Sequence, residues 1–258
     1  MQRLREIAPG VLVATGEQYT TTSTVVAGDA GGCLVVDPAV SVAEVAGLAA
    51  DLATAGLTAV AGFSTHPHWD HVLWSRDLGA EVPRYASELA VRVAGRERAG
   101  LISGVQDSAP GHDLELFGRL APLAGDTIPW DGPAAQVIVH DGHAPGHGAV
   151  FLPDTGVLLA GDMLSDIEIP ILDFDEPGQL GSYRAALDRL GAVEGVRWLV
   201  PGHGHVTDAA GFRERLAADR RYLDQLTAGQ PFDDPRLTVD WLREVHAAHL
   251  KAVAANVK

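Results

Sequence analysis

The strongest constraint in this sequence is a run of metal-ligand side chains, residues 65–71, that directly follows an apolar segment. Three histidines and one aspartate lie within six consecutive positions, at His66, His68, Asp70 and His71. A strand could not aim all four at one point, because successive side chains of a strand point to opposite faces. A loop that has just left a strand can do so, and imidazole and carboxylate are ligands that zinc and similar ions favour. We therefore interpret this stretch as a metal-binding loop rather than a histidine-rich surface loop.

The segment before this loop has the pattern of a strand, a helix and a second strand. Cys33–Val36 is a short apolar run, and Ser41 with Glu44 forms a capping box for a helical pattern that stops at Gly56. Leu57–Phe63 predicts the second strand. This order implies a parallel pair with the metal loop at its carboxyl end, where open α/β sheets usually hold their ligands.

The other elements are predicted from hydrophobic spacing and turn residues. Short strands are expected within residues 10–36, one of them over Tyr19–Val26, and Glu81–Tyr85 is expected as an edge strand because it contains Pro83. Strands are predicted at 135–139, 149–152, 156–160 and 196–200, and helices at 87–100, 178–190, 209–228 and 238–254. Residues 103–133 are expected to be irregular. Because no linker is evident, residues 1–258 are predicted to form one α/β domain built from two similar halves.

Composition bears on the class of protein and its partners. The formal net charge of −15 argues against a binder of nucleic acid or of anionic membranes. The single cysteine, Cys33, cannot form an internal disulfide and is expected in the core. No signal peptide or transmembrane-length apolar stretch is recognisable, so a cytoplasmic protein with a small-molecule substrate is expected. The oligomeric state is left open.

Three later positions repeat the pattern of an apolar strand that ends in a metal-ligand side chain. They are His147 after His143-Ala-Pro-Gly, Asp162 after Val157–Gly161, and His203 after Trp198–Gly202. Each alone is a weak signal, because a lone histidine or aspartate after a strand is usually a turn or cap residue. Together with the loop they supply five histidines and two aspartates. Seven ligands are too many for one tetrahedral zinc and suit two metals that share a carboxylate.

In their order and spacing these motifs resemble the metallo-β-lactamase-fold hydrolase superfamily. The matching stretches are 65–71, 144–147, 160–162 and 201–205. The resemblance implies a four-layer αββα sandwich with the metals at one edge between its sheets. It also implies that His66, His68 and His147 hold one ion, that Asp70, His71 and His203 hold the other, and that Asp162 bridges them. Asp37 resembles the aspartate that orients the metal loop from behind the ligands.

The implied activity is that of a dinuclear hydrolase. Two divalent ions, zinc first with iron or manganese as alternatives, would hold a shared hydroxide that attacks a small ester, lactone or amide. Asp70 is expected to orient this nucleophile and carry its proton. The residues after His71, Val72-Leu73-Trp74, depart from the glyoxalase II pattern, so thioester hydrolysis stays an alternative, as does phosphodiester hydrolysis. A mononuclear iron oxidoreductase of the persulfide-dioxygenase kind is the rival from another class.

Several further residues are candidates for the substrate pocket or for support of the ligands. Trp69, Tyr183 and His205 could each contact substrate or support the site, with core packing or surface exposure as the alternative, and His143 is expected to support the loop from outside the ligand set. Residues 164–175 could form a substrate loop. Arg92, Arg96 and Arg98 are interpreted as a solvated helix face, with an anion site as the alternative.

Overall fold

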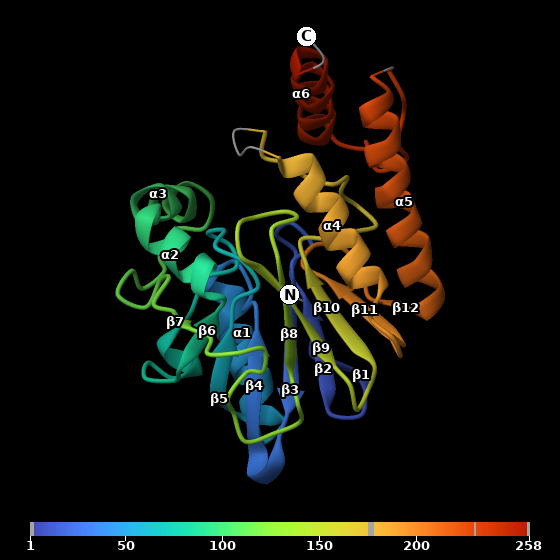
Figure 1. The fold of residues 1–258 in the computed structure, drawn as a ribbon. Helices are drawn as coiled ribbons and strands as arrows, with labels where there is room; N and C mark the ends of the chain where they lie inside the picture. The colour runs from blue at the N-terminus through green and yellow to red at the C-terminus, as the bar shows by residue number, and fades with distance from the viewer. Residues whose placement is uncertain (1–2, 175–177, 230, 257–258) are drawn as a thin grey trace.

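Two β-sheets form the centre of the protein, and each half of the chain contributes one of them (Figure 1). The computed structural model describes residues 3–174, 178–229 and 231–256. The first sheet has seven strands in chain order, and its first four are antiparallel while the last four run parallel. These strands are β1 (Arg5–Ala8), β2 (Val11–Thr15), β3 (Thr22–Ala27), β4 (Gly32–Val36), β5 (Thr58–Phe63), β6 (Arg84–Ala86) and β7 (Ala121–Pro122).

The second sheet has five strands in the order β12-β11-β10-β9-β8. They are β8 (Gln136–His140), β9 (His147–Leu152), β10 (Val157–Gly161), β11 (Trp198–Pro201) and β12 (Thr207–Asp208). Here β10 and β11 are parallel and the other pairs are antiparallel. The two halves are therefore similar in one respect, because each contains a parallel pair joined through a helix.

The helices lie on the outer faces of the sheets. They are α1 (Val42–Thr54), α2 (Glu88–Arg96), α3 (Arg98–Ser108), α4 (Gln179–Gly191), α5 (Ala209–Ala228) and α6 (Asp240–Asn256), with short 3₁₀ turns at Asp29–Gly31 and Arg76–Leu78. Figure 1 shows α1 to α3 on the side of the first sheet and α4 to α6 on the side of the second. None of the helices in the described ranges combines the length and apolar character needed to cross a bilayer.

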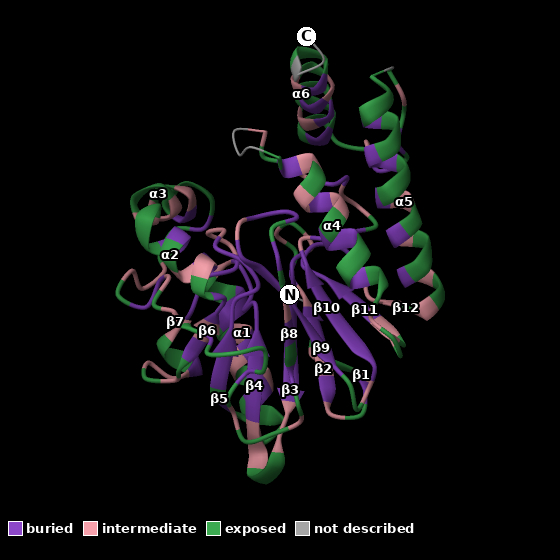
Figure 2. Cartoon of the chain, in the orientation of Figure 1, coloured by how far each residue is buried: buried purple, intermediate pink, exposed green. Residues whose placement is uncertain are grey.

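Side-chain alternation along the strands builds the four layers. Leu34 and Val36 of β4 face the second sheet, whereas Cys33 and Val35 face α1. The facing strands of the second sheet fill the centre with Val150 and similar residues, and α4 to α6 pack on its outer face. Figure 2 shows the strands buried along most of their length, while the helices expose one side. The expected αββα sandwich is thus confirmed, as is the buried position of Cys33.

The best-predicted element is α1, which begins where the sequence indicates. The side chain of Ser41 accepts a hydrogen bond from the Glu44 backbone N–H, and the Glu44 carboxylate accepts one from the Ser41 N–H at 3.1 Å. Gly56 ends the turn with a φ of +70°, a value that a residue with a side chain rarely adopts. The helix therefore returns the chain to β5 parallel to β4, and the metal loop leaves the carboxyl end of β5 as predicted.

Four details of the prediction were wrong. The helix predicted at 87–100 is two helices joined at Glu97, and the second extends through residues 103–108, which were expected to be irregular. The strand near Pro83 is not at the edge, since β6 pairs with both β5 and β7, and Pro83 lies just before it. The strand predicted to include Tyr19 begins only at Thr22. Likewise, His147 was expected in the loop that follows a strand, but it is the first residue of the next strand, β9. The three strand errors concern positions that pairing with other strands sets.

Candidate metal centre

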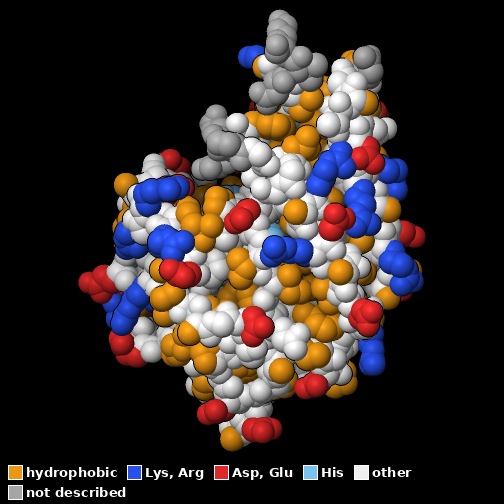
Figure 3. Space-filling view, viewed as in Figure 1, with side chains coloured by type: hydrophobic (Ala, Val, Ile, Leu, Met, Phe, Trp, Pro, Cys, Tyr) orange, Lys and Arg blue, Asp and Glu red, His pale blue; other side chains and the backbone are white. Residues whose placement is uncertain are grey.

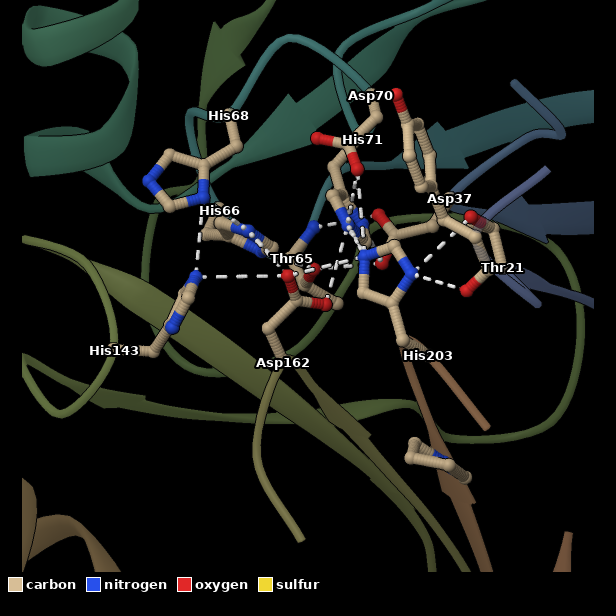
Figure 4. A network of polar contacts seen from close by, with 12 residues as sticks. Thr21, Asp37, Thr65, His66, His68, Asp70, His71, His143, Asp162 and His203 are labelled. Carbon is tan, nitrogen blue, oxygen red and sulfur yellow. Dashed lines mark hydrogen bonds and ion pairs between the residues drawn. The ribbon is translucent and has the colours of Figure 1, made fainter. Parts of the chain in front are cut away.

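The predicted ligands converge at one edge of the sandwich, where the carboxyl ends of β5, β10 and β11 meet (Figure 4). The two sheets are joined at this edge, because the Thr22 N–H donates to the Gly202 carbonyl at 2.8 Å and Thr21 pairs with His203. Residues distant in sequence are thereby brought within contact distance. The metal loop comes from the first sheet, and Asp162 and His203 come from the second.

One group of donor atoms comprises His66, His68, His143 and Asp162, all within 4.8 Å of one another. The Nε2 atom of His66 lies 3.0 Å from His68 Nδ1 and 3.4 Å from Asp162 Oδ2. His143 Nε2 closes the group at 3.1 Å from His68 Nδ1 and 3.5 Å from Asp162 Oδ2. Three imidazoles and a carboxylate therefore face one point.

A second group comprises Asp70, His71 and His203. His203 Nε2 lies 3.3 Å from Asp70 Oδ2 and 3.3 Å from His71 Nε2. Asp162 lies between the two groups, because its Oδ1 is 3.2 Å from His71 Nε2 and its Oδ2 is 3.3 Å from His203 Nε2. The carboxylate of Asp162 thus contacts members of both groups.

The donor atoms fit divalent metal ions. Around a tetrahedral zinc with bonds near 2.05 Å, ligand atoms lie about 3.3 Å apart. Neighbouring donor atoms in the two groups lie 3.0–3.7 Å apart, and all donor atoms of a group lie within 4.8 Å of one another. The buried Asp162 Oδ1 lies 3.2 Å from His71 Nε2 but makes no hydrogen bond of acceptable geometry with any of the described residues. A buried carboxylate oxygen without a hydrogen bond is costly unless a cation compensates it. Both observations favour ions as occupants of this centre.

His147 lies beside the first group, but its Nε2 contacts a backbone N–H and not the donor atoms of the group. Its Nε2 accepts the Asp162 backbone N–H at 3.2 Å, and its ring stacks between those of His66 and His140, at 4.9 and 4.5 Å. Its place in the ligand set therefore stays a prediction. His143, expected only to support the loop, instead directs Nε2 at the donor group. His143 lies only four residues before His147, and this spacing could have indicated a second candidate ligand. The family motif included His147 alone.

The Asp37 carboxylate contacts the metal loop at Thr65 and His71. Its Oδ1 accepts the Thr65 backbone N–H at 2.8 Å, and its Oδ2 accepts the Thr65 hydroxyl at 2.6 Å. The same Oδ2 lies 3.0 Å from His71 Nδ1, and Thr65 Oγ1 lies 2.9 Å from His66 Nδ1. A ligating histidine whose other nitrogen has such a partner is held in one orientation. Asp37 and Thr65 thus orient one histidine from each group.

The charges at the centre compensate one another. Burial raises the pKa of Asp70, yet His71 and His203 hold it below its usual value. For His71, burial lowers the pKa, but the nearby carboxylates, Asp162 first, raise it well above normal. Burial, reinforced by His68, lowers the pKa of His143 to about 3, so this imidazole is neutral. Divalent ions would replace the protons on the histidines, because metal binding requires the neutral imidazole.

The predicted substrate loop, whose described part is 164–174, lies against His203; residue 175 falls outside the described residues. The hydroxyl of Ser165 donates to the His203 carbonyl at 2.7 Å and accepts the Glu168 backbone N–H at 3.1 Å. Burial raises the pKa of Glu168 to about 7; the charge of His203 opposes this shift and that of Asp162 adds to it. Glu168 is therefore a carboxyl group beside the centre that sequence reasoning did not single out.

The remaining candidates lie in less direct positions. Tyr183 is fully buried in the core between α4 and α5. His205 is an exposed side chain whose Nδ1 lies 2.9 Å from Asp166 Oδ2. Trp69 is only partly buried and lies beside the metal ligands on the same loop.

Arg92 and Arg96 form surface ion pairs with Glu88 and Glu97. Arg98 instead donates to the Leu114 carbonyl at 2.6 Å and to that of Phe117, a structural role.

Comparison with known families agrees with this geometry. The model of the metallo-beta-lactamase superfamily matches residues 16–203, which include every predicted ligand. The chain therefore belongs to the metallo-beta-lactamase superfamily.

Similar curated proteins are named hydroxyacylglutathione hydrolase. The one from Synechococcus sp. (strain JA-3-3Ab) is 36% identical over 113 residues, which cover 44% of this chain and 38% of that protein. The one from Rhodobacter capsulatus is 31% identical over 180 residues, covering 68% of this chain and 61% of that protein. The chain therefore matches less than two thirds of the length of these relatives.

Solved structures share the fold. A beta-lactamase domain protein from Burkholderia ambifaria superposes with a TM-score of 0.73 at 18% identity, covering 98% of this chain and 88% of that one. A metallo-beta-lactamase family protein from Thermus thermophilus gives 0.68 at 22% identity, covering 96% and 94%. At such identities the likeness establishes the architecture alone.

Proposed function

We propose that this protein is a dinuclear metal-dependent hydrolase that cleaves a small thioester or ester. The observation that carries the proposal is the pair of donor groups that share the Asp162 carboxylate. Two separate groups favour two ions over the single iron of a dioxygenase. The proposed ligands are His66, His68, Asp162, Asp70, His71 and His203, with His143 or His147 completing the first group. Zinc is the first candidate for both positions, and a cytoplasmic location stays a prediction of the sequence.

Bound divalent ions supply a water of lowered pKa and a polarised substrate carbonyl. The chain's own contribution starts with Asp70, whose Oδ2 lies beside both His71 and His203 and whose side chain is 13% exposed. This position lets the carboxylate accept a hydrogen bond from the attacking water, take its proton and pass it to the leaving group. Thr65, which contacts His66 Nδ1, and Asp37, which lies 3.0 Å from His71 Nδ1, would keep these histidines oriented throughout, because the contacts do not involve the substrate.

The names of similar proteins suggest which substrate class to test first. The sequence alone favoured an oxygen ester, lactone or amide and left thioesters as an alternative. Two similar proteins are named hydroxyacylglutathione hydrolase, a name that denotes cleavage of an acyl bond to sulfur. A thioester is therefore the first substrate to test, followed by aryl esters and lactones with the same acyl group.

The test combines metal analysis with a matched pair of variants. Protein purified without added metal should contain about two divalent ions per chain and hydrolyse a thioester or ester. Asp162→Ala should lose at least one ion and reduce kcat/KM by about 100-fold or more. Asp154→Ala, an exposed aspartate in the turn between β9 and β10, is the control and should resemble the wild type. A single iron with oxygen consumption, or full activity in Asp162→Ala, would refute the proposal.

A further inference from the structure

The end of the sandwich opposite the metal centre contains a cavity between the two sheets. Its walls include the β1–β2 turn, the β9–β10 turn and the start of β11, whereas the metal ligands follow the carboxyl ends of β10 and β11. Figure 1 shows both turns at the lower end of the sheets. The cavity has a volume of about 390 Å³, and small-molecule sites usually have about 300–1,000 Å³. It is therefore large enough to hold a ligand away from the metal centre.

The walls of this cavity are mainly apolar. Val11 and Val26 of the first sheet and Leu152 of the second line it, and all three are buried in the core between the sheets. Ile7 and Trp198 are partly buried and pack against the same core. Figure 3 shows apolar side chains exposed among charged ones over the lower part of the molecule. Such a lining favours a ligand with an apolar body, because binding removes that body from water.

One cationic side chain, that of Arg197, lines the cavity. It is exposed, and within the described parts of the chain it forms no hydrogen bond or ion pair. Its stem lies over Gly156, where a Cβ atom would be 2.8 Å from Arg197 Cγ and 3.2 Å from its Cδ. The Arg197 backbone N–H also donates to the Gly156 carbonyl at 2.7 Å. The stem is thus held at the wall, and the guanidinium stays available to an anion.

An opposing charge, Asp154, limits which anion would bind. Its exposed side chain lines the same cavity and makes no ion pair with Arg197. A bound anion would experience repulsion from this carboxylate, and the repulsion is smaller for a singly charged group than for a doubly charged one. A planar guanidinium can hold both oxygens of a carboxylate at once. A carboxylate is therefore the head group that suits this site best.

We propose that this cavity binds a medium-chain fatty acid, with its chain between the sheets and its carboxylate on Arg197. The apolar walls, the unpaired cation and the volume of the cavity support the same ligand. This site is independent of the proposed hydrolysis, because the cavity and the metal centre lie at opposite ends of β11. A fatty acid and a substrate could therefore be bound at the same time.

Calorimetric titration of the metal-loaded protein tests the proposal with three probes that share one chain length. They are octanoate, octan-1-ol and octan-1-amine, which differ in the charge of the head group. We expect about one octanoate per chain, bound roughly tenfold more tightly than the alcohol, the size of one charge-assisted hydrogen bond. The amine should bind no more tightly than the alcohol, because Arg197 repels its charge.

Variants of the cavity separate the charge from the apolar walls. Arg197→Gln should weaken octanoate binding about tenfold and leave the alcohol unchanged, whereas Arg197→Lys should keep most of the octanoate affinity. Ala134→Trp places an indole at an exposed position that lines the cavity, so it should weaken both ligands. Arg221→Gln removes an exposed arginine from α5 and is the matched control, which should bind octanoate like the wild type.

Two further variants decide where the carboxylate lies. Asp162→Ala removes a shared ligand of the metal centre and should leave the octanoate affinity unchanged, which separates the cavity from direct binding to a metal ion. Asp154→Ala removes the repelling carboxylate and should strengthen octanoate binding.

Several results would overturn the proposal. Equal affinities for octanoate and octan-1-ol, or an unchanged octanoate affinity in Arg197→Gln, would show that the arginine does not bind the head group. Tighter binding of octan-1-amine would assign the head group to Asp154 instead. Loss of octanoate binding in Asp162→Ala would place the carboxylate on the metals. Because no turnover is measured, none of these results depends on the proposed hydrolysis.

Discussion

At the scale of single residues, the metal centre depends on positions where no side chain fits. Gly161 precedes Asp162 and has a φ of +55°. A Cβ atom there would lie 2.4 Å from His147 Nε2 and 3.0 Å from Thr65 Oγ1. The glycine therefore allows His147, Thr65 and Asp162 to occupy adjoining space.

Replacement of this glycine should disrupt both stability and metal binding. Gly161→Ala combines an unfavourable φ with a steric clash, so we expect the free energy of unfolding to fall by about 3 kcal/mol or more. Gly56→Ala is the control, because Gly56 has a φ of +70° with nothing within 4 Å of the added Cβ; its loss should be about 1 kcal/mol. Urea unfolding and metal analysis measure the two effects. If both variants lost the same free energy of unfolding and kept their full metal content, neighbouring atoms would have moved to accommodate the methyl group at position 161.

At the scale of elements, the first turn of α1 joins the helix to the chain just before β3. The Glu44 carboxylate accepts the Glu17 backbone N–H at 2.7 Å in addition to its capping contacts with Ser41. Burial raises the pKa of Glu44, but these hydrogen bonds outweigh it and lower the pKa below its ordinary value of 4.5. One carboxylate therefore holds two segments that are distant in sequence.

The contribution of Glu44 should depend on pH. Because its pKa is lower in the folded state, the stabilisation is present above the unfolded value of 4.5 and is lost as pH falls through the folded value. Glu44→Gln should therefore lower the free energy of unfolding by about 1 kcal/mol at pH 7 and by less near pH 3.5. Denaturant unfolding across this range measures the difference. A loss that grows toward low pH would contradict the sign of this argument.

At the scale of the whole molecule, a buried ionic cluster connects the segment before α6 to α5. Arg236 lies 2.5 Å from Asp219 Oδ1 and 2.9 Å from Asp234 Oδ1, and all three side chains are buried. Burial raises the pKa of Asp219 to about 6 although Arg236 opposes the shift. Because the folded pKa lies above the ordinary value of 3.8, this group destabilises the fold increasingly as pH rises from about 4 to 6.

Replacement of Arg236 should increase the free-energy cost of burying the charged Asp219 carboxylate. Arg236→Met leaves Asp219 without its cation, so we expect the free energy of unfolding to fall by about 3–5 kcal/mol at pH 7.5. The loss should be smaller at pH 5, where Asp219 takes up a proton. The double variant Arg236→Met with Asp219→Asn is the control and should recover part of the stability at pH 7.5. A loss of equal size at both pH values would mean that the charge of Asp219 is not its cause.

The sequence alone determined the elements whose signals are local. The capping box at Ser41 set the start of α1, and the apolar run before His66 set β5 and the end of the sheet at which the loop leaves it. Spacing of the motifs also indicated the superfamily, since ligand types and their order are properties of the chain itself. Cys33 and the buried strands followed from composition and alternation.

Only the tertiary structure decided which atoms meet. His143 and His147 are equally good ligands by chemistry, and their ring orientations depend on packing against His66, His140 and Asp162. The place of β6 inside its sheet depends likewise on contacts with distant strands. The physical reason is that side-chain type is encoded locally, whereas side-chain direction is fixed by neighbours that only the folded chain supplies.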